Sequence, residues 1–251
     1  MIEPIWKFKP VNQQLIDVAV KNFQLPEEYV RLLVLRGIFN REDSKDFFNP
    51  NDDKLHDPFI MKDMELAVDR ILNQLNPNNR ILVFGDYDVD GTTGTAMLYL
   101  FLKDNGFDVQ FYIPNRENEG YGLSVEGIDY ASLIGANLLI TCDCGINAIS
   151  RVDYANNNNI DVIITDHHKP DAVLPNAFAI LNPNQSDCSY PFKGLCGAGV
   201  AFKLAIALCE TGGFDLDSAW QHSDLIATAI AADIVPVIDE NRIIVNHGLK
   251  L

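Results

Sequence analysis

The spacing of hydrophobic residues changes near residue 78, and this change divides the chain into two regions. Before it, apolar residues recur at intervals of three and four, the period of amphipathic helices. These stretches are residues 12–23, 26–38, 44–48 and 61–75. Pro26 stands where a helix tolerates proline, at its start. We therefore predict a small, mainly helical N-terminal region over residues 1–78, ended by the Asn and Pro residues of 76–79.

After residue 78 the pattern changes to short, nearly continuous apolar runs that alternate with helical stretches. The candidate strands are residues 80–85, 108–114, 137–143, 161–166 and 178–183. Strands of a parallel sheet are buried on both faces, so they lack the strict alternation of half-exposed strands. This pattern predicts an α/β domain over residues 79–251, with a parallel β-sheet flanked by helices.

Acidic and imidazole side chains follow three of the predicted strands. In chain order they are Asp86, Asp88, Asp90, Asp143, Asp166, His167 and His168. Because the carboxyl ends of parallel strands share one edge of the sheet, where ligands bind, one site could collect all of them. Asp233 ends a markedly apolar helical stretch and is a further candidate.

The net charge of −16 lies mainly in the second region, since residues 77–251 carry −13 of it. Such a balance argues against a phosphate-rich partner, which normally requires clustered Lys and Arg. Crowded carboxylates repel one another and raise one another's pKa unless cations lie between them. The cluster is therefore a candidate site for divalent cations.

Less specific interpretations compete with a metal site. A single Asp after a strand is more often a turn or helix N-cap residue, and a His pair can lie on the surface. Three aspartates at alternate positions are harder to explain in this way. If the strand continued through them, their side chains would point to one side, Gly91 would allow the turn, and Thr92 or Thr93 would cap the next helix. Cys142 and Cys144 have no zinc or redox spacing, so we interpret them as packing thiols.

Four segments in order carry a resemblance to a known family. They are DYDVDG at 86–91, CDCGI at 142–146, DHH at 166–168 and AADIVP at 231–236. Together they resemble the DHH phosphoesterase family. Further segments resemble its RecJ branch of single-stranded-DNA exonucleases, from about residue 6 to the end. Examples are VRLLVLRGI at 30–38, PNRENEGYGLS at 114–124 and GLCGAGVAFKL at 194–204.

The resemblance implies a two-metal hydrolase, with Mn²⁺ or Mg²⁺, that releases 5′ mononucleotides from single-stranded DNA in repair and recombination. It implies five metal ligands: Asp88, Asp90, Asp143, His167 and Asp233. Asp143 would bridge the ions, and the catalytic residues Asp86, His168 and Arg116 would lie near the metals or a substrate phosphate. An imidazole among oxygen ligands favours Mn²⁺ over Mg²⁺. Asp166 could orient a histidine.

Alternatives to these assignments remain open. Arg116 could form an ion pair with Glu117 or Glu119, and Tyr121 and Gly122 could form only a turn. The chain could also be a small-substrate phosphoesterase, acting on oligonucleotides, cyclic dinucleotides or pyrophosphate, or a non-catalytic DNA-binding homologue.

The resemblance also bears on partners, domains and location. It implies a single-stranded 5′ end as substrate, with a single-strand-binding protein and a helicase as partners. It implies a DHH-associated domain and an OB-fold that this sequence lacks, so we expect an N-terminal fragment. The N-terminus has no secretion signal, no run of eighteen apolar residues occurs, and the five cysteines have no framework spacing, so we expect a cytoplasmic protein without a membrane span.

Overall fold

The computed structural model describes residues 7, 9–76 and 78–251, which form two compact units, Met1–Asp53 and Lys54–Leu251. The first unit contains α1 (Gln13–Phe23), α2 (Glu27–Val34) and α3 (Arg41–Phe48). Side-chain oxygens of Asn12 and Asn40 cap α1 and α3, and Ile16 and Val30 belong to the small apolar core of this unit. The predicted helical N-terminal region is confirmed.

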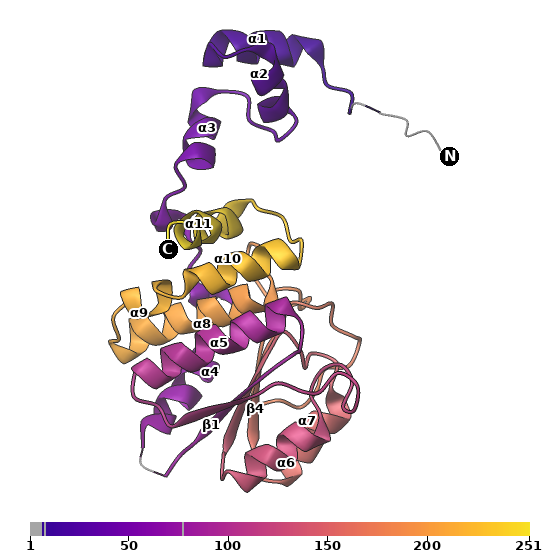
Figure 1. The fold of residues 1–251 in the computed structure, drawn as a ribbon, viewed down its shortest axis with the longest axis vertical. Coiled ribbons are helices and arrows are strands. Elements are labelled where there is room, and N and C mark those ends of the chain that lie inside the picture. Colours follow the sequence, from indigo (N-terminus) through magenta and orange to yellow (C-terminus); the bar gives the residue numbers. More distant parts are fainter. Residues whose placement is uncertain (1–6, 8, 77) are drawn as a thin grey trace. The chain divides into compact units, whose positions relative to one another are not determined.

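A five-stranded, all-parallel sheet forms the centre of the second unit (Figure 1). Its strands are β1 (Ile81–Gly85), β2 (Val109–Tyr112), β3 (Leu138–Cys142), β4 (Asp161–Thr165) and β5 (Ala179–Leu181). Their order in the sheet is β2-β1-β3-β4-β5. All five predicted strands are present, and the predicted fold class is confirmed.

Helices cover both faces of this sheet (Figure 1). One face bears α4 (Met64–Leu72), α5 (Val89–Asp104) and α8 (Gly197–Gly212), with α9 (Asp217–Trp220), α10 (Ser223–Ala232) and α11 (Asp239–Gly248) packed around them. The other face bears α6 (Val125–Leu133) and α7 (Ile149–Asn157). Alternate residues of each strand enter the two cores: Ile81 and Val83 on one side, Leu82 and Phe84 on the other. Burial on both faces explains the continuous apolar runs.

The chain changes direction across the sheet between β1 and β3. It passes from β1 outward to β2 and then returns to β3 on the other side of β1. Crossovers in opposite directions place α5 and α6 on opposite faces of the sheet. In sheets of this kind ligands bind where the direction reverses, which is here at the carboxyl ends of β1 and β3, where the predicted acidic residues begin.

The division between the two units differs from the boundary predicted at residue 78, because it falls between Asp53 and Lys54. Helix α4 belongs to the second unit, since Met64, Val68 and Ile71 are fully or almost fully buried in the core that contains α8. Three short 3₁₀ turns flank this segment: Asp52–Lys54, Pro58–Ile60 and Asn73–Leu75. The helical period alone did not show against which unit α4 packs.

A fully buried ion pair joins α8 to α11. Lys203 Nζ lies 2.8 Å from Glu240 Oε1 and also donates to the His56 carbonyl at 2.5 Å. Tyr190 donates its hydroxyl to Glu240 Oε2, also at 2.5 Å. Each charge is therefore compensated by a partner and by further hydrogen bonds, which such burial requires.

Two predictions about residue classes can also be compared with the structure. All five cysteines are free and buried, and Cys142 and Cys144 pack inside the sheet region as predicted. Within the described ranges, the structure contains no helix with the length and apolar character that crossing a membrane requires.

Candidate metal centre

The segment after β1 turns sharply into a helix instead of continuing as a strand. Gly85 ends β1, and Asp88 is the N-cap of α5, where its carboxylate accepts a hydrogen bond from Gly91 N at 2.9 Å. Asp90 lies in the first turn of α5. The strand therefore does not continue through Asp86, Asp88 and Asp90, which was the condition for their side chains to point to one side, because Asp88 already begins the helix.

The prediction that a threonine caps this helix is also wrong. Asp88 occupies the cap, and the hydroxyls of Thr92 and Thr93 instead donate to helix carbonyls, at 2.5 Å to Asp88 O and 2.6 Å to Val89 O. A β-carbon at Gly91 would lie 2.6 Å from the Asp86 carbonyl oxygen. The glycine is therefore needed for the close approach of the helix to the strand end.

Asp90 is buried and connects α5 to α8. Its two carboxylate oxygens accept hydrogen bonds from Gly197 N at 2.6 Å and Ala198 N at 2.8 Å, at the start of α8. The side chain of the preceding cap residue, Cys196, does not accept a hydrogen bond from the first N–H groups of α8. Asp90 therefore acts as a cap for α8, and the free N–H groups of that helix stabilise its negative charge.

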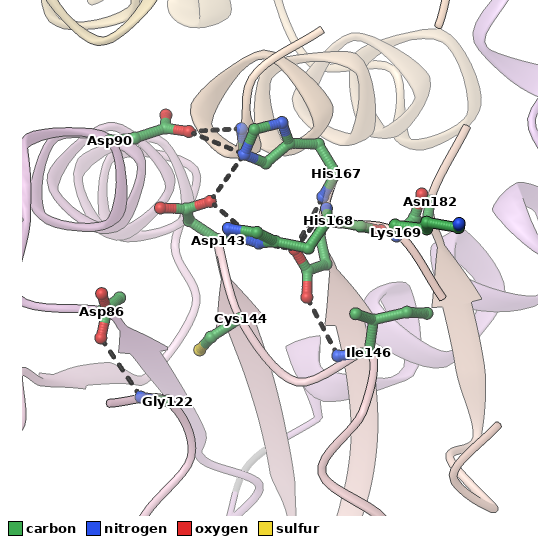
Figure 2. A network of polar contacts seen from close by, with 12 residues as sticks. Asp86, Asp90, Gly122, Asp143, Cys144, Ile146, His167, His168, Lys169 and Asn182 are labelled. Atoms are coloured by element: carbon green, nitrogen blue, oxygen red, sulfur yellow. Dashed lines mark hydrogen bonds and ion pairs between the residues drawn. The ribbon is translucent and has the colours of Figure 1, made fainter. Parts of the chain in front are cut away.

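Asp143 lies directly after β3 in a left-handed backbone conformation, with φ of 61°. Its side chain is 2% exposed, and among the described residues its Oδ1 has no hydrogen-bond donor. Its nearest cationic candidate is His167 Nε2, 3.2 Å from Oδ1 (Figure 2). Burial, with the neighbouring charges of Asp90 and Asp88, raises the pKa of Asp143 to about 10. A buried acid with so little compensation suits a bound cation.

Asp166 fixes the loop that carries both histidines. Its Oδ1 accepts hydrogen bonds from the backbone N–H groups of His167 at 2.7 Å and His168 at 3.0 Å, and its Oδ2 accepts one from Ile146 N at 2.9 Å. His168 Nδ1 also lies 2.7 Å from Oδ1. Burial opposes its charge, but the hydrogen bond with His168 and the backbone donors hold the pKa of Asp166 below its usual value. The expectation that Asp166 orients a histidine agrees with this geometry.

His168 has contacts on both sides of its ring. The hydrogen bond with Asp166 raises its pKa, and the Tyr121 hydroxyl lies 3.2 Å from its Nε2. Tyr121 therefore does more than form a turn. This contact was missed in the sequence, because nothing in the local pattern of residues 120–122 indicates which strand end the loop reaches.

Asp233 completes the cluster from α10, where it is the C-cap residue. Its Oδ2 lies 3.7 Å from His167 Nε2, the same distance that separates Nε2 from Asp90 Oδ2. Burial raises the pKa of Asp233. One imidazole nitrogen thus faces carboxylates from α5, from the end of β3 and from the end of α10.

Among the described residues, two sets could each hold a metal ion, because the ligand atoms within each set all lie within 4.8 Å of one another. They are Asp90, His167 and Asp233, and Asp143, His167 and His168. His168, expected near the metals, is therefore as close to Asp143 and His167 as a ligand would be. The exposed Asp88 belongs to neither set, and its carboxylate faces the α5 backbone. The mixed imidazole and carboxylate donors fit Mn²⁺, and the unsatisfied Asp143 Oδ1 is the atom that most requires a cation.

Asp86 and Arg116 lie outside these two sets. Asp86 is fully buried; its Oδ1 accepts a hydrogen bond from Gly122 N at 3.3 Å, and its Oδ2 has no partner among the described residues. Burial raises its pKa. The exposed Arg116 lies 5.2 Å from the Tyr87 ring centroid. Neither ion pair considered for Arg116, with Glu117 or Glu119, occurs in the described part of the chain, so its guanidinium has no carboxylate partner there.

Comparison with known proteins agrees with this arrangement. The DHH family, N-terminal domain, matches residues 80–232. The single-stranded-DNA-specific exonuclease RecJ of Bacillus subtilis (strain 168) is 39% identical over 245 residues, which cover 98% of this chain and 30% of the relative. RecJ of Escherichia coli (strain K12) is 41% identical over 197 residues, covering 74% and 34%.

Solved structures of RecJ proteins are also similar to this chain. RecJ of Thermus thermophilus in complex with Mn²⁺ has a TM-score of 0.76 at 29% identity, over 96% of this chain and 33% of that chain. An exonuclease RecJ bound to manganese has a TM-score of 0.68 at 36% identity, over 76% and 48%. This chain spans about a third of the length of the curated RecJ relatives. Because the family model matches residues 80–232, which contain all five strands of the sheet, the chain belongs to the DHH family.

Proposed function

We propose that this chain carries the catalytic metal centre of a single-stranded-DNA-specific 5′-to-3′ exonuclease, which releases 5′ mononucleotides in DNA repair and recombination. The observation behind the proposal is the position of His167 Nε2, 3.2 Å from Asp143 and 3.7 Å from both Asp90 and Asp233. One imidazole among three carboxylates from separate elements is typical of a centre for a divalent transition metal. The relatives named as RecJ support DNA as the substrate.

The proposed ligands are Asp88, Asp90, Asp143, His167 and Asp233, for two ions of Mn²⁺ or Mg²⁺. When bound, such a pair of ions lowers the pKa of water and offsets the charge on the phosphate. Asp143, with a buried Oδ1 that lacks a donor, is the proposed bridge. Asp88 is included among the proposed ligands because of its position in the motif and because its charge contributes to the raised pKa of Asp143.

The remaining residues hold the substrate or the ligands in place. Asp166, through its three backbone donors, keeps His168 beside the cluster. His168 and Arg116 are proposed to contact substrate phosphates, and Asp86 holds the loop at Gly122. Hydrolysis would form a P–O bond to water and break the P–O3′ bond. The proton passes to the leaving 3′ oxygen, so the products are a 5′ mononucleotide and a strand with a new 5′ phosphate.

The proposal includes the context in which such an enzyme acts. The substrate is a 5′ end of single-stranded DNA, and a single-strand-binding protein and a helicase are the proposed partners. The proposed location is the cytoplasm, where the five free cysteines would remain reduced. We also propose residues 79–251 as the DHH domain, with α4 as a preceding helix packed against it.

The test uses the 251-residue chain with Mn²⁺ and four substrates: a 5′-labelled single strand, the same strand in a duplex, pyrophosphate and a cyclic dinucleotide. We expect only slow release of mononucleotides, from the single strand alone, and a loss of more than about 100-fold in Asp143→Asn or His167→Ala. Asp224→Asn, an exposed acid in the first turn of α10, should retain activity. Hydrolysis of pyrophosphate or the cyclic dinucleotide, with the strand left intact, would contradict the proposal.

A further inference from the structure

A turn after β5 holds the loop that carries the two histidines. This loop consists of Asp166, His167 and His168, and we call it the histidine loop. The Asp166 carboxylate accepts hydrogen bonds from the N–H groups of the loop, and two asparagine side chains bind its carbonyl groups. Asn184 Nδ2 donates to the His167 carbonyl at 2.6 Å, and Asn182 Nδ2 donates to the His168 carbonyl at 2.9 Å. The backbone of the histidine loop is therefore held through both its N–H and its carbonyl groups.

The turn that carries the two asparagines lies beside the histidine loop because of the order of the strands. β5 runs parallel to β4 at the edge of the sheet, so the residues that follow these two strands are neighbours. Asn182 is fully buried, and its Oδ1 accepts a hydrogen bond from Asn184 N at 2.8 Å, the contact of an Asx turn. Gln185 Nε2 donates to the Ile180 carbonyl at 2.8 Å. The side chains of the turn therefore fix its conformation and tie it to β5.

Contacts from two other segments anchor the same turn. Lys193 Nζ donates to the carbonyls of Pro183 and Cys188, the second at 2.9 Å. Lys62 N donates to Cys188 Sγ at 3.5 Å. These contacts involve no carboxylate of the metal cluster. The fold therefore sets the position of Asn184 without help from the acidic groups of the site.

The imidazole of His167 depends on this support more than that of His168 does. His168 Nδ1 lies 2.7 Å from Asp166 Oδ1, and this contact fixes the direction of its ring. His167 Nε2 faces the three carboxylates of the cluster, and its Nδ1 has no hydrogen-bond partner in the described part of the chain. A histidine ligand is usually oriented by a hydrogen bond of its second ring nitrogen. Without that bond, the direction of the His167 ring depends on its backbone, whose carbonyl Asn184 holds.

We propose that Asn184 is a positioning residue that strengthens the preference of the metal centre for Mn²⁺ over Mg²⁺. The inference rests on the metal centre of the proposed function. By holding the His167 carbonyl, Asn184 keeps the imidazole directed at the three carboxylates. Mn²⁺ accepts an imidazole ligand readily, whereas Mg²⁺ prefers oxygen ligands and retains bound water. Loosening the imidazole therefore weakens Mn²⁺ binding more than Mg²⁺ binding, since the hydrogen bonds from α8 still hold Asp90 in place.

The test measures metal binding by the 251-residue chain without DNA. Free Mn²⁺ is counted by its electron paramagnetic resonance signal, and the affinity for Mg²⁺ is obtained from its displacement of Mn²⁺. We expect Asn184→Ala to weaken Mn²⁺ binding at least about tenfold, as the loss of an outer contact to a metal ligand does, and Mg²⁺ binding less than about threefold. Asn184 is half-buried and loses one side-chain donor in this variant, so the chain should remain folded, which urea unfolding checks.

Two controls separate positioning from a general loss of structure. Asn156→Ala also removes an asparagine amide that donates to a carbonyl, that of Asn176 at 2.9 Å, but this contact precedes β5 and lies at the amino ends of the strands. It should leave both affinities unchanged. In a His167→Ala background, Asn184→Ala should not change the ratio of the two affinities further, because the imidazole on which Asn184 acts is absent.

Three results would overturn the inference: an equal loss for both metals, an unchanged ratio of affinities, or the same loss of Mn²⁺ affinity with and without His167. The outcome is independent of DNA hydrolysis. A chain that shows the expected change of the ratio but hydrolyses no DNA would refute the proposed function alone, whereas an unchanged ratio in an active nuclease would refute this inference alone.

Discussion

Replacing Asp143 by asparagine is expected to stabilise the metal-free protein and to remove most of its stabilisation by Mn²⁺. The carboxylate is 2% exposed, its Oδ1 has no hydrogen-bond donor, and its backbone is left-handed at φ of 61°. Asparagine tolerates that backbone conformation better than most residues, so the change removes charge with little added strain.

The size of the effect follows from the raised pKa of this carboxyl, about 10 against an ordinary value of 3.8. Because the folded state binds the proton more tightly, the stabilising contribution of Asp143 is fully present below about pH 4 and is lost as pH rises toward 10. One pH unit corresponds to about 1.4 kcal/mol, so at pH 7 the loss could reach about 4 kcal/mol. Relaxation of the site and entry of water reduce this loss, and we expect Asp143→Asn to be more stable than the wild type by roughly 2 kcal/mol at pH 7.

The assay is urea unfolding of both proteins in EDTA between about pH 6 and pH 8.5, repeated with saturating Mn²⁺. Wild-type stability should fall with rising pH more steeply than that of Asp143→Asn. With Mn²⁺ the order should reverse, since a ligand at 100 times its Kd adds about 2.7 kcal/mol to a protein that binds it. Asp153→Asn, an exposed acid on α7, is the charge-matched control and should follow the wild type.

One result would refute this reasoning. If Asp143→Asn in EDTA is less stable than both the wild type and Asp153→Asn near pH 7.5, then the carboxylate stabilises the folded protein without metal. The imidazole of His167, 3.2 Å away, would then be the nearest group able to compensate the charge of the carboxylate.

Three further predictions follow from packing and charge. Gly197→Ala should cost about 1–3 kcal/mol and weaken Mn²⁺ binding, because its β-carbon would lie 2.7 Å from Asp143 Cα; unchanged calorimetric affinity would contradict this. Lys203→Met should cost about 3–5 kcal/mol in urea unfolding by leaving the Glu240 carboxylate buried without its cation, whereas Lys203→Met with Glu240→Leu should recover much of the loss. Single-stranded DNA should bind weakly in fluorescence anisotropy, with a slope of log K on log salt of about −2, since residues 77–251 carry −13 and the cations Arg116, Arg151 and Lys169 are three that have no carboxylate partner among the described residues. A slope beyond about −4 would contradict this prediction.

The sheet could be predicted from the sequence because strands buried on both faces consist almost entirely of apolar or small residues. Residues 81–85 and 138–142 are fully buried strands, and both appear in the sequence as unbroken apolar or small-residue runs. The convergence of Asp143 and His167 could be predicted for the same reason, since both follow parallel strands and so reach one edge.

Contacts between distant segments could not be predicted from local patterns. Residues 86–90 could either continue β1 or begin α5, and the N-cap hydrogen bond of Asp88 decides for the helix within only a few residues. The hydrogen bonds from α8 to Asp90 join residues more than a hundred positions apart, and the reach of Tyr121 to His168 depends on a loop without regular structure. Such contacts depend on how distant segments pack in three dimensions, and the spacing of hydrophobic residues along the chain carries no information about that.

The buried carboxylates of this site differ in how far the protein itself compensates their charge. Asp166 has three backbone donors and the His168 ring, and Asp90 has the two N–H groups that begin α8. Among the described residues, Asp86 has one backbone donor, and Asp143 Oδ1 has no donor but lies near the imidazoles of His167, at 3.2 Å, and His168, at 3.8 Å. Since a buried charge without donors is the least stable arrangement, a bound cation gains most beside Asp143. The donors to Asp90 and Asp166 instead fix the positions of the groups around that cation. Asp90 and Asp166 therefore orient the site, whereas Asp143 is the residue that most requires the metal.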